Sequence, residues 1–246
     1  MKKSLSLVSV IFILLSVSSC STGYVVENDG VYYESWNESS GQLHKLIQGA
    51  DPKTFIKFKF DEYGKDKNLV YYQGKPLIYA DAATFTAIGE WYAKDKFRGY
   101  YAGDSILSST GINFKIIDSY YSTDGKDVFH TTKPLHVCNT KNFKFVYTDE
   151  KNTWERWTTD GCYYYFREYK IPSEDYKNVQ LFKDVGGFAK DKKWVYYLDR
   201  KINFDKNGKK IIENVDVETF QVTDFLECRD KYGCINPYSG REDCKK

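Results

Sequence analysis

Hydrophobic and polar residues alternate in short blocks along nearly the whole chain, and residues 66–85 show the block pattern most clearly. Three polar residues at 66–68 precede a β-branched and aromatic run at 70–72, which ends at the Gly-Lys-Pro of residues 74–76. Asp and Asn favour chain reversal because their side chains hydrogen-bond the local backbone, whereas Val and Tyr fit a half-buried strand. The pattern predicts a turn followed by a strand at residues 70–72.

A second polar signal follows this strand. The Asp81 carboxylate is placed to accept hydrogen bonds from amides two or three residues later, as an N-cap does, so we predict one short helical turn over residues 81–85. An apolar series from Phe85 to Tyr92 then leads to the next polar turn at residues 94–96. Each unit is therefore predicted to be a hairpin followed by a capped turn.

This unit returns, with some drift, along the chain. The aspartates that open successive turns, here called the turn aspartates, are 29, 29, 36, 31 and 39 residues apart: Asp66, Asp95, Asp124, Asp160, Asp191 and Asp230. Such self-similarity indicates a repeat architecture, in which stacked neighbours supply the stability that a lone hairpin lacks. We predict an all-β, solenoid-like tandem β-hairpin repeat array over residues 24–246, with six units and a C-terminal half-unit from residue 223. The alternative is a β-propeller, in which six or seven units close into a ring.

Aromatic residues make up 17% of the chain, with 22 Tyr, 16 Phe and 5 Trp. Large rings bury the most area for each side chain, which suits a thin repeat with little interior. Because adjacent residues of a strand point to opposite faces, each Tyr-Tyr pair is expected to bury one ring and to leave the other for the surface.

Three stretches carry a family resemblance. Residues 66–72, 92–96 and 188–197 contain the polar turn with the aromatic residues around it, and they resemble the DKNYY repeat family. The resemblance covers nearly all of the chain after residue 23. It implies a bacterial cell-envelope protein and brings no catalytic residue with it.

The N-terminus has the features of a lipoprotein signal peptide. Lysines at positions 2 and 3 precede an apolar run at residues 5–17, which is too short for a membrane-spanning helix. Residues 17–20 resemble the lipobox of bacterial lipoproteins, which implies cleavage after residue 19 and attachment of palmitate-type acyl chains to Cys20. The alternative is ordinary signal-peptidase cleavage, because small residues precede the cut in that case too.

The expected product is a domain tethered to a membrane through residues 20–23. Two or more acyl chains give stable anchoring, so we expect a lipid-anchored protein of the bacterial cell envelope, with the outer membrane favoured. Removal of residues 1–19 takes away two lysines and no acid, which leaves 34 basic and 34 acidic residues. A nucleic-acid-binding protein would show a basic excess, so that class is excluded.

Export permits disulfides, and five cysteines remain besides Cys20. An odd number leaves at least one thiol without an intramolecular partner. Cys228 and Cys234 flank the turn at Asp230, so we predict a disulfide between them, with Cys234–Cys244 as the alternative. Cys138 takes the place of Ala80 in the repeat, where a small buried residue is expected.

Two groups of residues resemble metal sites. His130, His136 and Cys138 fall within nine residues, but the repeat accounts for them as strand positions, and a fourth ligand is missing. Residues 203–208 suggest a calcium loop, but its twelfth position is Asn214 rather than Glu, and lysines crowd it. We predict a turn-rich insertion there, and neither a metal nor a cofactor.

No catalytic motif stands out from the repeat, and the many Asp and Lys residues occupy turns, where charge is normally solvated. We therefore predict a non-catalytic envelope lipoprotein whose elongated surface binds other proteins. The alternative is a carbohydrate-binding module that uses exposed rows of aromatic rings. Exposure of four equivalent rings would favour that alternative, and burial would count against it: Tyr71, Tyr100, Tyr164 and Tyr196.

Overall fold

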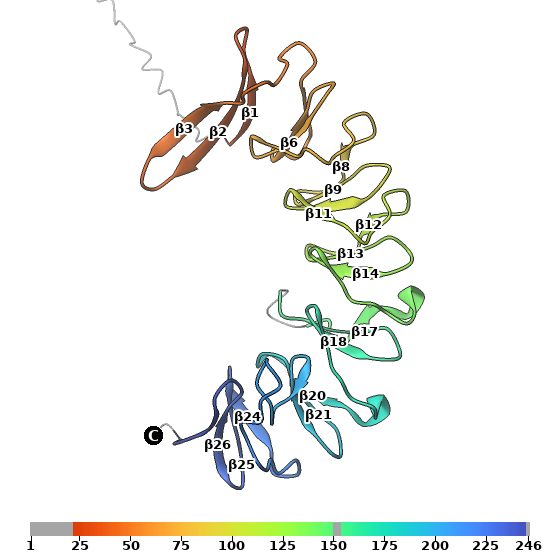
Figure 1. The fold of residues 1–246 in the computed structure, drawn as a ribbon, viewed down its shortest axis with the longest axis vertical. Helices are drawn as coiled ribbons and strands as arrows, with labels where there is room; N and C mark the ends of the chain where they lie inside the picture. The colour runs from red at the N-terminus through yellow and green to blue at the C-terminus, as the bar shows by residue number, and fades with distance from the viewer. Residues whose placement is uncertain (1–21, 150–153, 245–246) are drawn as a thin grey trace, which may run out of the picture.

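Residues 22–149 and 154–244 are described by the computed structural model, which arranges them as seven small antiparallel sheets in a row (Figure 1). The first sheet has three strands, and every later one has four, in chain order. The first three sheets are β1 (Gly23–Val26), β2 (Val31–Asn37) and β3 (Gly41–Leu46); β4 (Ile56–Lys57), β5 (Tyr63–Lys65), β6 (Val70–Tyr72) and β7 (Lys75–Pro76); and β8 (Thr86–Ala87), β9 (Tyr92–Lys94), β10 (Gly99–Tyr101) and β11 (Asp104–Ile106).

The other four sheets follow the same plan. They are β12 (Lys115–Ile116), β13 (Tyr121–Thr123), β14 (Val128–His130) and β15 (Lys133–Pro134); β16 (Lys144–Phe145), β17 (Trp157–Thr159), β18 (Tyr164–Phe166) and β19 (Tyr169–Lys170); β20 (Gln180–Leu181), β21 (Phe188–Lys190), β22 (Val195–Tyr197) and β23 (Arg200–Lys201); and β24 (Gln221–Asp224), β25 (Glu227–Asp230), β26 (Gly233–Asn236) and β27 (Gly240–Glu242). Two of the capped turns contain 3-10 helices, η1 (Thr140–Asn142) and η2 (Tyr176–Asn178).

The predicted strand at residues 70–72 is confirmed as β6, one arm of the central hairpin of its sheet. From the second sheet on, each hairpin is flanked by two further strands, of only two residues in most sheets, so that the unit is a four-stranded meander rather than a hairpin alone. Two-residue strands carry no readable alternation of polar and apolar residues. This is why the sequence pattern did not reveal them.

The row of sheets bends into an open crescent, with the first and last sheets at its two ends (Figure 1). The predicted all-β repeat array is therefore confirmed, and the ring of the propeller alternative is not formed. The capped turns and 3-10 helices lie along the convex edge, whereas the turns that join β6 to β7 and β10 to β11 face the concave side (Figure 1). The C-terminal tail differs from the expected half-unit, because it forms the complete sheet β24–β27.

The hydrophobic core is divided into layers between neighbouring sheets. In one layer, Tyr63 from β5 and Phe85 from the capped turn pack with Ala93 and Tyr100 of the next sheet. The position two residues before each turn aspartate is small and buried, because the ring from the preceding capped turn packs there. Its occupants are Gly64, Ala93, Ser122, Thr158, Ala189 and Cys228.

The polar ends of buried rings also join neighbouring sheets. The Tyr63 hydroxyl donates a hydrogen bond to the Trp91 carbonyl at 2.9 Å and accepts one from the Gly103 amide at 3.1 Å. Tyr24 makes the same two bonds one sheet earlier, to the Glu62 carbonyl and from the Gly74 amide. The ring therefore supplies packing while its hydroxyl satisfies backbone groups of the next sheet.

Each turn aspartate ties its hairpin to the capped turn before it. Asp66 Oδ1 accepts hydrogen bonds from the amides of Asn68 and Leu69, both at 2.7 Å. Its Oδ2 accepts from the Asp51 amide and from the Tyr71 hydroxyl, both at 3.0 Å. All six turn aspartates are at most 7% exposed. The turn chemistry predicted from the sequence is confirmed, and the second oxygen extends it to the neighbouring unit.

The Gly99→Val substitution is expected to lower the free energy of unfolding by about 1–3 kcal/mol, as overpacking does. Most other units have Val at this position, so a consensus argument would predict stabilisation. In the structure, however, an added Cβ would collide with the Phe114 ring, which occupies the space beside Gly99. Chemical denaturation of the two variants Gly99→Val and Gly99→Val/Phe114→Leu tests this. The smaller Leu should restore part of the loss, and a stabilised single variant would contradict the assignment.

Candidate functional site

Aromatic rings and carboxylates gather at the concave side of the second and third sheets. Tyr72 and Tyr101 end β6 and β10, next to turns that face this side, and Trp91 immediately precedes β9. Trp91 and Tyr101 stack with ring centroids 6.4 Å apart and an interplanar angle of 23°. Trp91 is 41% exposed, so its ring is available to a partner. We call these three rings, with Glu62, Glu90 and Asp104, the concave strip.

The carboxylates of the concave strip act electrostatically on one phenol. The pKa of Tyr72 is raised by burial and then by the negative charges of Glu62, Asp104 and Glu90. In the part of the chain that the structure describes, none of these three carboxylates has an ion-pair partner. Exposed ring faces and unpaired carboxylates both attract ammonium and guanidinium groups. The strip therefore offers contacts suited to lysine or arginine side chains.

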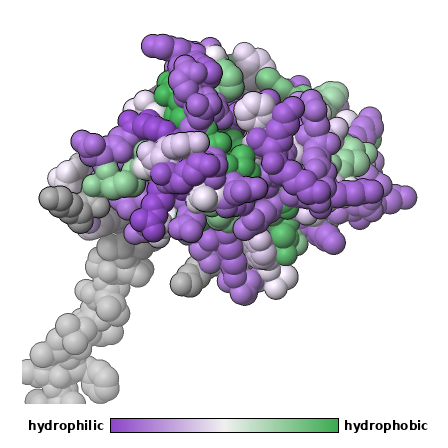
Figure 2. Space-filling view, turned by 90° about the horizontal axis from the view of Figure 1, so that it is seen from below, coloured by the Kyte–Doolittle hydropathy of each residue, from purple (hydrophilic) through white to green (hydrophobic). Residues whose placement is uncertain are grey.

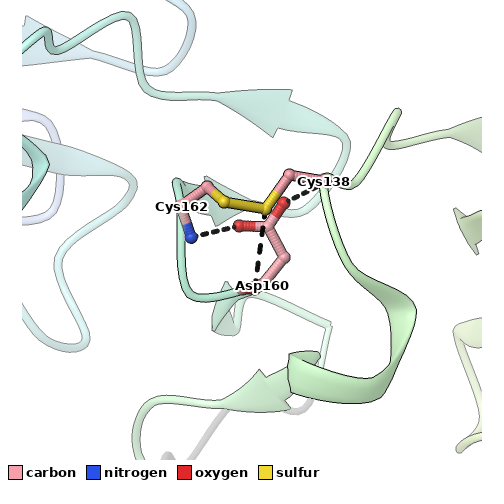
Figure 3. A group of neighbouring side chains, drawn as sticks. All are labelled: Cys138, Asp160 and Cys162. Carbon is pink, nitrogen blue, oxygen red and sulfur yellow. Dashed lines mark hydrogen bonds between the residues drawn. A yellow bond between two sulfur atoms is a disulfide. The ribbon is translucent and has the colours of Figure 1, made fainter.

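A second cluster lies where the fourth and fifth sheets meet, and Figure 3 shows its three side chains. A disulfide joins Cys138, in the loop after β15, to Cys162, in the turn between β17 and β18. Asp160 lies beneath it, fully buried: its Oδ2 accepts from the Cys138 amide at 2.7 Å, and its Oδ1 accepts from the Cys162 amide at 2.8 Å. Both cysteines are exposed.

Within the described residues, this is the one group of three His, Cys, Asp or Glu side chains whose ligand atoms lie within 4.8 Å of one another. The two sulfur atoms are bonded to each other, and both carboxylate oxygens already accept hydrogen bonds. Burial opposes ionisation of Asp160, but hydrogen bonds from the Cys138 and Cys162 amides outweigh it, so the pKa of this carboxyl is lowered. In its oxidised form the group is thus a structural fastening between two sheets.

The predicted Cys228–Cys234 disulfide is wrong, and the alternative Cys234–Cys244 pair is present. Cys228 lies opposite Ile235 in the hairpin, one position away from Cys234, so the two cysteine side chains point to opposite faces of the sheet. Cys228 is a buried free thiol, and burial raises its pKa to about 12. The Cys234–Cys244 bond instead lies at the outer face of the last sheet.

The small, buried position that was expected for Cys138 is occupied by Cys228 instead. Cys138 is exposed and disulfide-bonded rather than a small buried residue. Cys228 has the buried position two residues before the turn aspartate, which Gly64 and Ala93 fill in earlier units. Small residues recur at that position in the sequence, two residues before each turn aspartate, and this recurrence could have identified Cys228 as part of the core.

The histidines do not converge on a shared site. His130 is 1% exposed and takes the place of Tyr72 in its unit, as predicted, with Nδ1 3.2 Å from Glu168 Oε2. His136 is exposed, and its Nδ1 lies 3.4 Å from Asp127 Oδ2. Burial works against ionisation of Glu168, but its interaction with the nearby His130 ring outweighs burial, so the pKa of Glu168 is lowered.

The insertion at residues 203–214 is built from turns, in agreement with the prediction. Asp205 Oδ1 accepts hydrogen bonds from the amides of Asn207 and Lys209, at 2.8 and 2.9 Å. The Asn203 side-chain amide donates to the Ile212 carbonyl at 3.2 Å. The side chains that suggested a calcium loop are therefore used to hold the backbone of the insertion.

A hollow of about 270 Å³ lies between the fifth and sixth sheets. Both acidic and basic side chains line it, and the Lys201 ammonium lies 3.8 Å from the centre of the Trp194 ring. No histidine, serine or cysteine is among its lining residues: Pro172, Glu174, Asp175, Asp191, Lys192, Lys193, Trp194, Tyr196 and Lys201. The hollow shows no nucleophile beside a histidine base.

The rings that would support carbohydrate binding are mostly buried. Tyr71, Tyr100 and Tyr196 are at most 1% exposed, and Tyr164 is half-buried and stacks on Tyr176 with centroids 4.6 Å apart. The surface seen from the end of the crescent that carries the last sheet is largely hydrophilic, with hydrophobic residues gathered toward its middle (Figure 2). The structure thus provides no row of these four rings on one face.

The predicted lipidation site, Cys20, lies outside the described residues. Among the residues that are described, no helix has the length and apolar character needed to span a membrane.

Sequence comparison identifies one relationship. No curated protein and no solved structure matches the chain. A sequence model of the DKNYY family matches residues 24–156, which is more than half of the chain and covers the first four sheets together with the start of the fifth. The turn aspartates, the lysines after two of them and the aromatic pairs in this region are the features from which the inter-sheet contacts are built. This chain belongs to the DKNYY family.

Proposed function

We propose that the protein is a lipid-anchored lipoprotein of the bacterial cell envelope and serves there as a non-catalytic scaffold for protein interaction. The anchor is proposed from the sequence, in which Cys20 directly follows an apolar export signal. The interaction role is supported chiefly by one observation, the concave strip on an open crescent. Curved repeat proteins characteristically use such concave surfaces to bind partners.

The chemistry of the strip favours a protein partner over a glycan. Its exposed ring, Trp91, is accompanied by three unpaired carboxylates, which complement basic side chains. Burial of Tyr71, Tyr100 and Tyr196 counts against carbohydrate binding through aromatic rows. The outer membrane remains the favoured location, as a proposal from the sequence.

The anchor is tested by metabolic labelling with an alkyne analogue of palmitate in bacterial cells that express the full chain. The wild-type protein should take up label and sediment with membranes. A Cys20→Ser variant should lose the label and leave the membrane fraction, because two acyl chains supply the binding energy. A Cys234→Ser variant controls for labelling at other cysteines, and label that persists in Cys20→Ser would contradict the proposed anchor.

The interaction surface is tested by photocrosslinking in cells of the native host. A photoreactive amino acid at position 91 should give a specific protein adduct, whereas the same residue at position 112, which is 79% exposed in a capped turn, should not. Adding Glu62→Lys and Glu90→Lys should abolish the adduct from position 91 by reversing the charge of the strip. Equal adducts from both positions, or an adduct that survives charge reversal, would contradict this surface.

A further inference from the structure

We propose that the Cys138–Cys162 disulfide is a site of thiol–disulfide exchange, at which a dithiol reductant unlocks the junction between the fourth and fifth sheets. The proposal rests on how the six junctions of the array are fastened, and it does not depend on the proposed lipid anchor or partner. The proposal gives a chemical role to a disulfide whose two cysteines are not part of the repeat.

Three junctions are fastened by ion pairs. The lysine after the turn aspartate pairs with the aspartate that begins the preceding capped turn: Lys67–Asp51 at 3.4 Å, Lys96–Asp81 at 2.9 Å and Lys231–Asp216 at 2.6 Å. The amides of these three lysines also donate to the threonine of the same capped turn. These contacts are reversible and exposed to solvent, so each contributes modestly to stability.

Two other junctions use a hydroxyl group. Thr110 Oγ1 donates to Asp124 Oδ2 at 3.0 Å, and Ser173 Oγ donates to Asp191 Oδ2 at 2.7 Å. In both cases a side chain of the capped turn reaches the turn aspartate directly. The hydrogen bond to a carboxylate replaces the ion pair of the other junctions.

At its capped turn, the junction between the fourth and fifth sheets has neither of these contacts. Gly161 follows the turn aspartate where four of the other five units have Lys and the fourth sheet has Gly125, and Asn139 stands where other units have Asp or Thr. The Asn139 side chain caps its own turn by accepting from the Lys141 amide at 3.0 Å. At this capped turn Asp160 accepts a hydrogen bond from the Cys138 amide, and the disulfide is the second contact. Elsewhere in the same junction, Arg156 pairs with Asp118 at 3.0 Å and His130 Nδ1 lies 3.2 Å from Glu168 Oε2. At the capped turn, a covalent bond therefore takes the place of the polar side-chain contact that the other junctions have there.

The bond is placed for exchange. Both cysteines are exposed, whereas Asp160 and its bonds to the Cys162 and Tyr163 amides lie beneath them. A thiolate of the reductant attacks one sulfur and releases the other cysteine as a thiol; the second thiol of the reductant then resolves the mixed disulfide. Two electrons and two protons pass to Cys138 and Cys162, and the dithiol becomes a disulfide.

Reduction should loosen this junction without unfolding either sheet. The rings of Tyr121 and Phe145 still pack across it, with centroids 5.5 Å apart, and Asp160 still holds its own turn. The disulfide closes a separation of 24 residues along the chain. On the loop-entropy model, opening a loop of this size makes separation of its ends roughly 300-fold more favourable. The crescent would thereby gain a hinge at its middle.

Hydrogen exchange of the full chain tests the proposal, in a Cys234→Ser/Cys244→Ser background so that dithiothreitol acts on one bond. Reduction should accelerate exchange of the Cys138 and Cys162 amides by at least tenfold, toward the roughly 300-fold limit of the loop-entropy model, and leave the second, third and sixth sheets unchanged. In the same background, Cys138→Ala/Cys162→Ser should exchange as the reduced protein does. Cys138→Thr/Cys162→Ser should exchange more slowly, because Thr can donate to Asp160 as Thr110 does to Asp124.

Three results would overturn the proposal. The bond could resist dithiothreitol while the sheets remain folded, which would show that it is not a site of exchange. The Ala/Ser variant could exchange at the same rate as the oxidised protein, which would show that the bond does not fasten the junction. Exchange could also rise equally in all sheets of both variants, which would assign the disulfide to global stability alone.

Discussion

Asp66→Ala is expected to lower the free energy of unfolding by about 3–4 kcal/mol, one of the largest effects of any single substitution in this chain. The carboxylate is 3% exposed and accepts four hydrogen bonds. Alanine leaves the buried Tyr71 hydroxyl and the Asp51 amide without this acceptor. The loss therefore includes the cost of unpaired buried donors as well as the bonds themselves.

Asp66→Asn separates the two functions of this side chain, which are to hold its own turn through Oδ1 and to bond the preceding capped turn through Oδ2. Its carbonyl oxygen can still accept from the Asn68 and Leu69 amides, but its NH₂ group would face the Asp51 amide, so a donor would meet a donor. We expect a loss smaller than that of the alanine variant. Chemical denaturation followed by circular dichroism measures both, with the exposed Asp61→Ala as control. A loss below about 1 kcal/mol for Asp66→Ala, the net value of an ordinary hydrogen bond, would contradict the anchoring role.

The array is expected to unfold cooperatively in mild acid, because its buried turn aspartates act together. Burial opposes their ionisation, but the hydrogen bonds they accept from backbone amides and side chains outweigh it, so the folded-state pKa lies below the ordinary value of 3.8 in five of them: Asp66, Asp124, Asp160, Asp191 and Asp230. The unfolded chain then binds protons more readily than the folded one. The stability these groups provide is fully present above the unfolded pKa and is lost as the pH falls through the folded values.

Each such carboxyl adds up to about 1.4 kcal/mol per pH unit to the slope of stability against pH. Thermal unfolding at a series of pH values from 7 to 2 should therefore show a plateau and then a steep fall below about pH 4, near the unfolded pKa of Asp. Hydrogen bonds rather than exposed ion pairs cause most of the shift, so 0.5 M salt should move the fall only slightly. A melting temperature that stays constant down to pH 2 would contradict this account.

The repeat could be read from the sequence because its signals are local. A turn aspartate bonds amides two and three residues later, and Val70–Tyr72 fits a strand, so each feature depends on residues within a few positions. Their return along the chain was sufficient to predict an all-β array. The two-residue outer strands escaped the prediction because they are defined by pairing with the hairpin rather than by a pattern of their own.

The candidate sites were harder to predict because each requires contacts between units. Trp91 belonged to an apolar series, and nothing in the sequence marked Glu90 or Asp104. The structure showed that Trp91 stacks on Tyr101 and that both carboxylates act on Tyr72 of the preceding sheet. The exchange site had a visible signal, since Gly161 replaces the lysine that follows most turn aspartates, but that lysine's partner became known only from the structure. None of these residues was therefore predicted as a site.

The sequence by itself determined the unit, its period and its strand-forming hairpins, because these follow from short-range backbone chemistry. Only the tertiary structure decided the cysteine pairing. Cys228 lies opposite Ile235, one position away from Cys234, so its side chain points into the core, whereas Cys234 faces Cys244. It also decided that the array stays open and that Asp160 and the Cys138–Cys162 bond together fasten one junction. Register and stacking are set by the summed packing of many distant side chains, and no local stretch of the chain carries that sum.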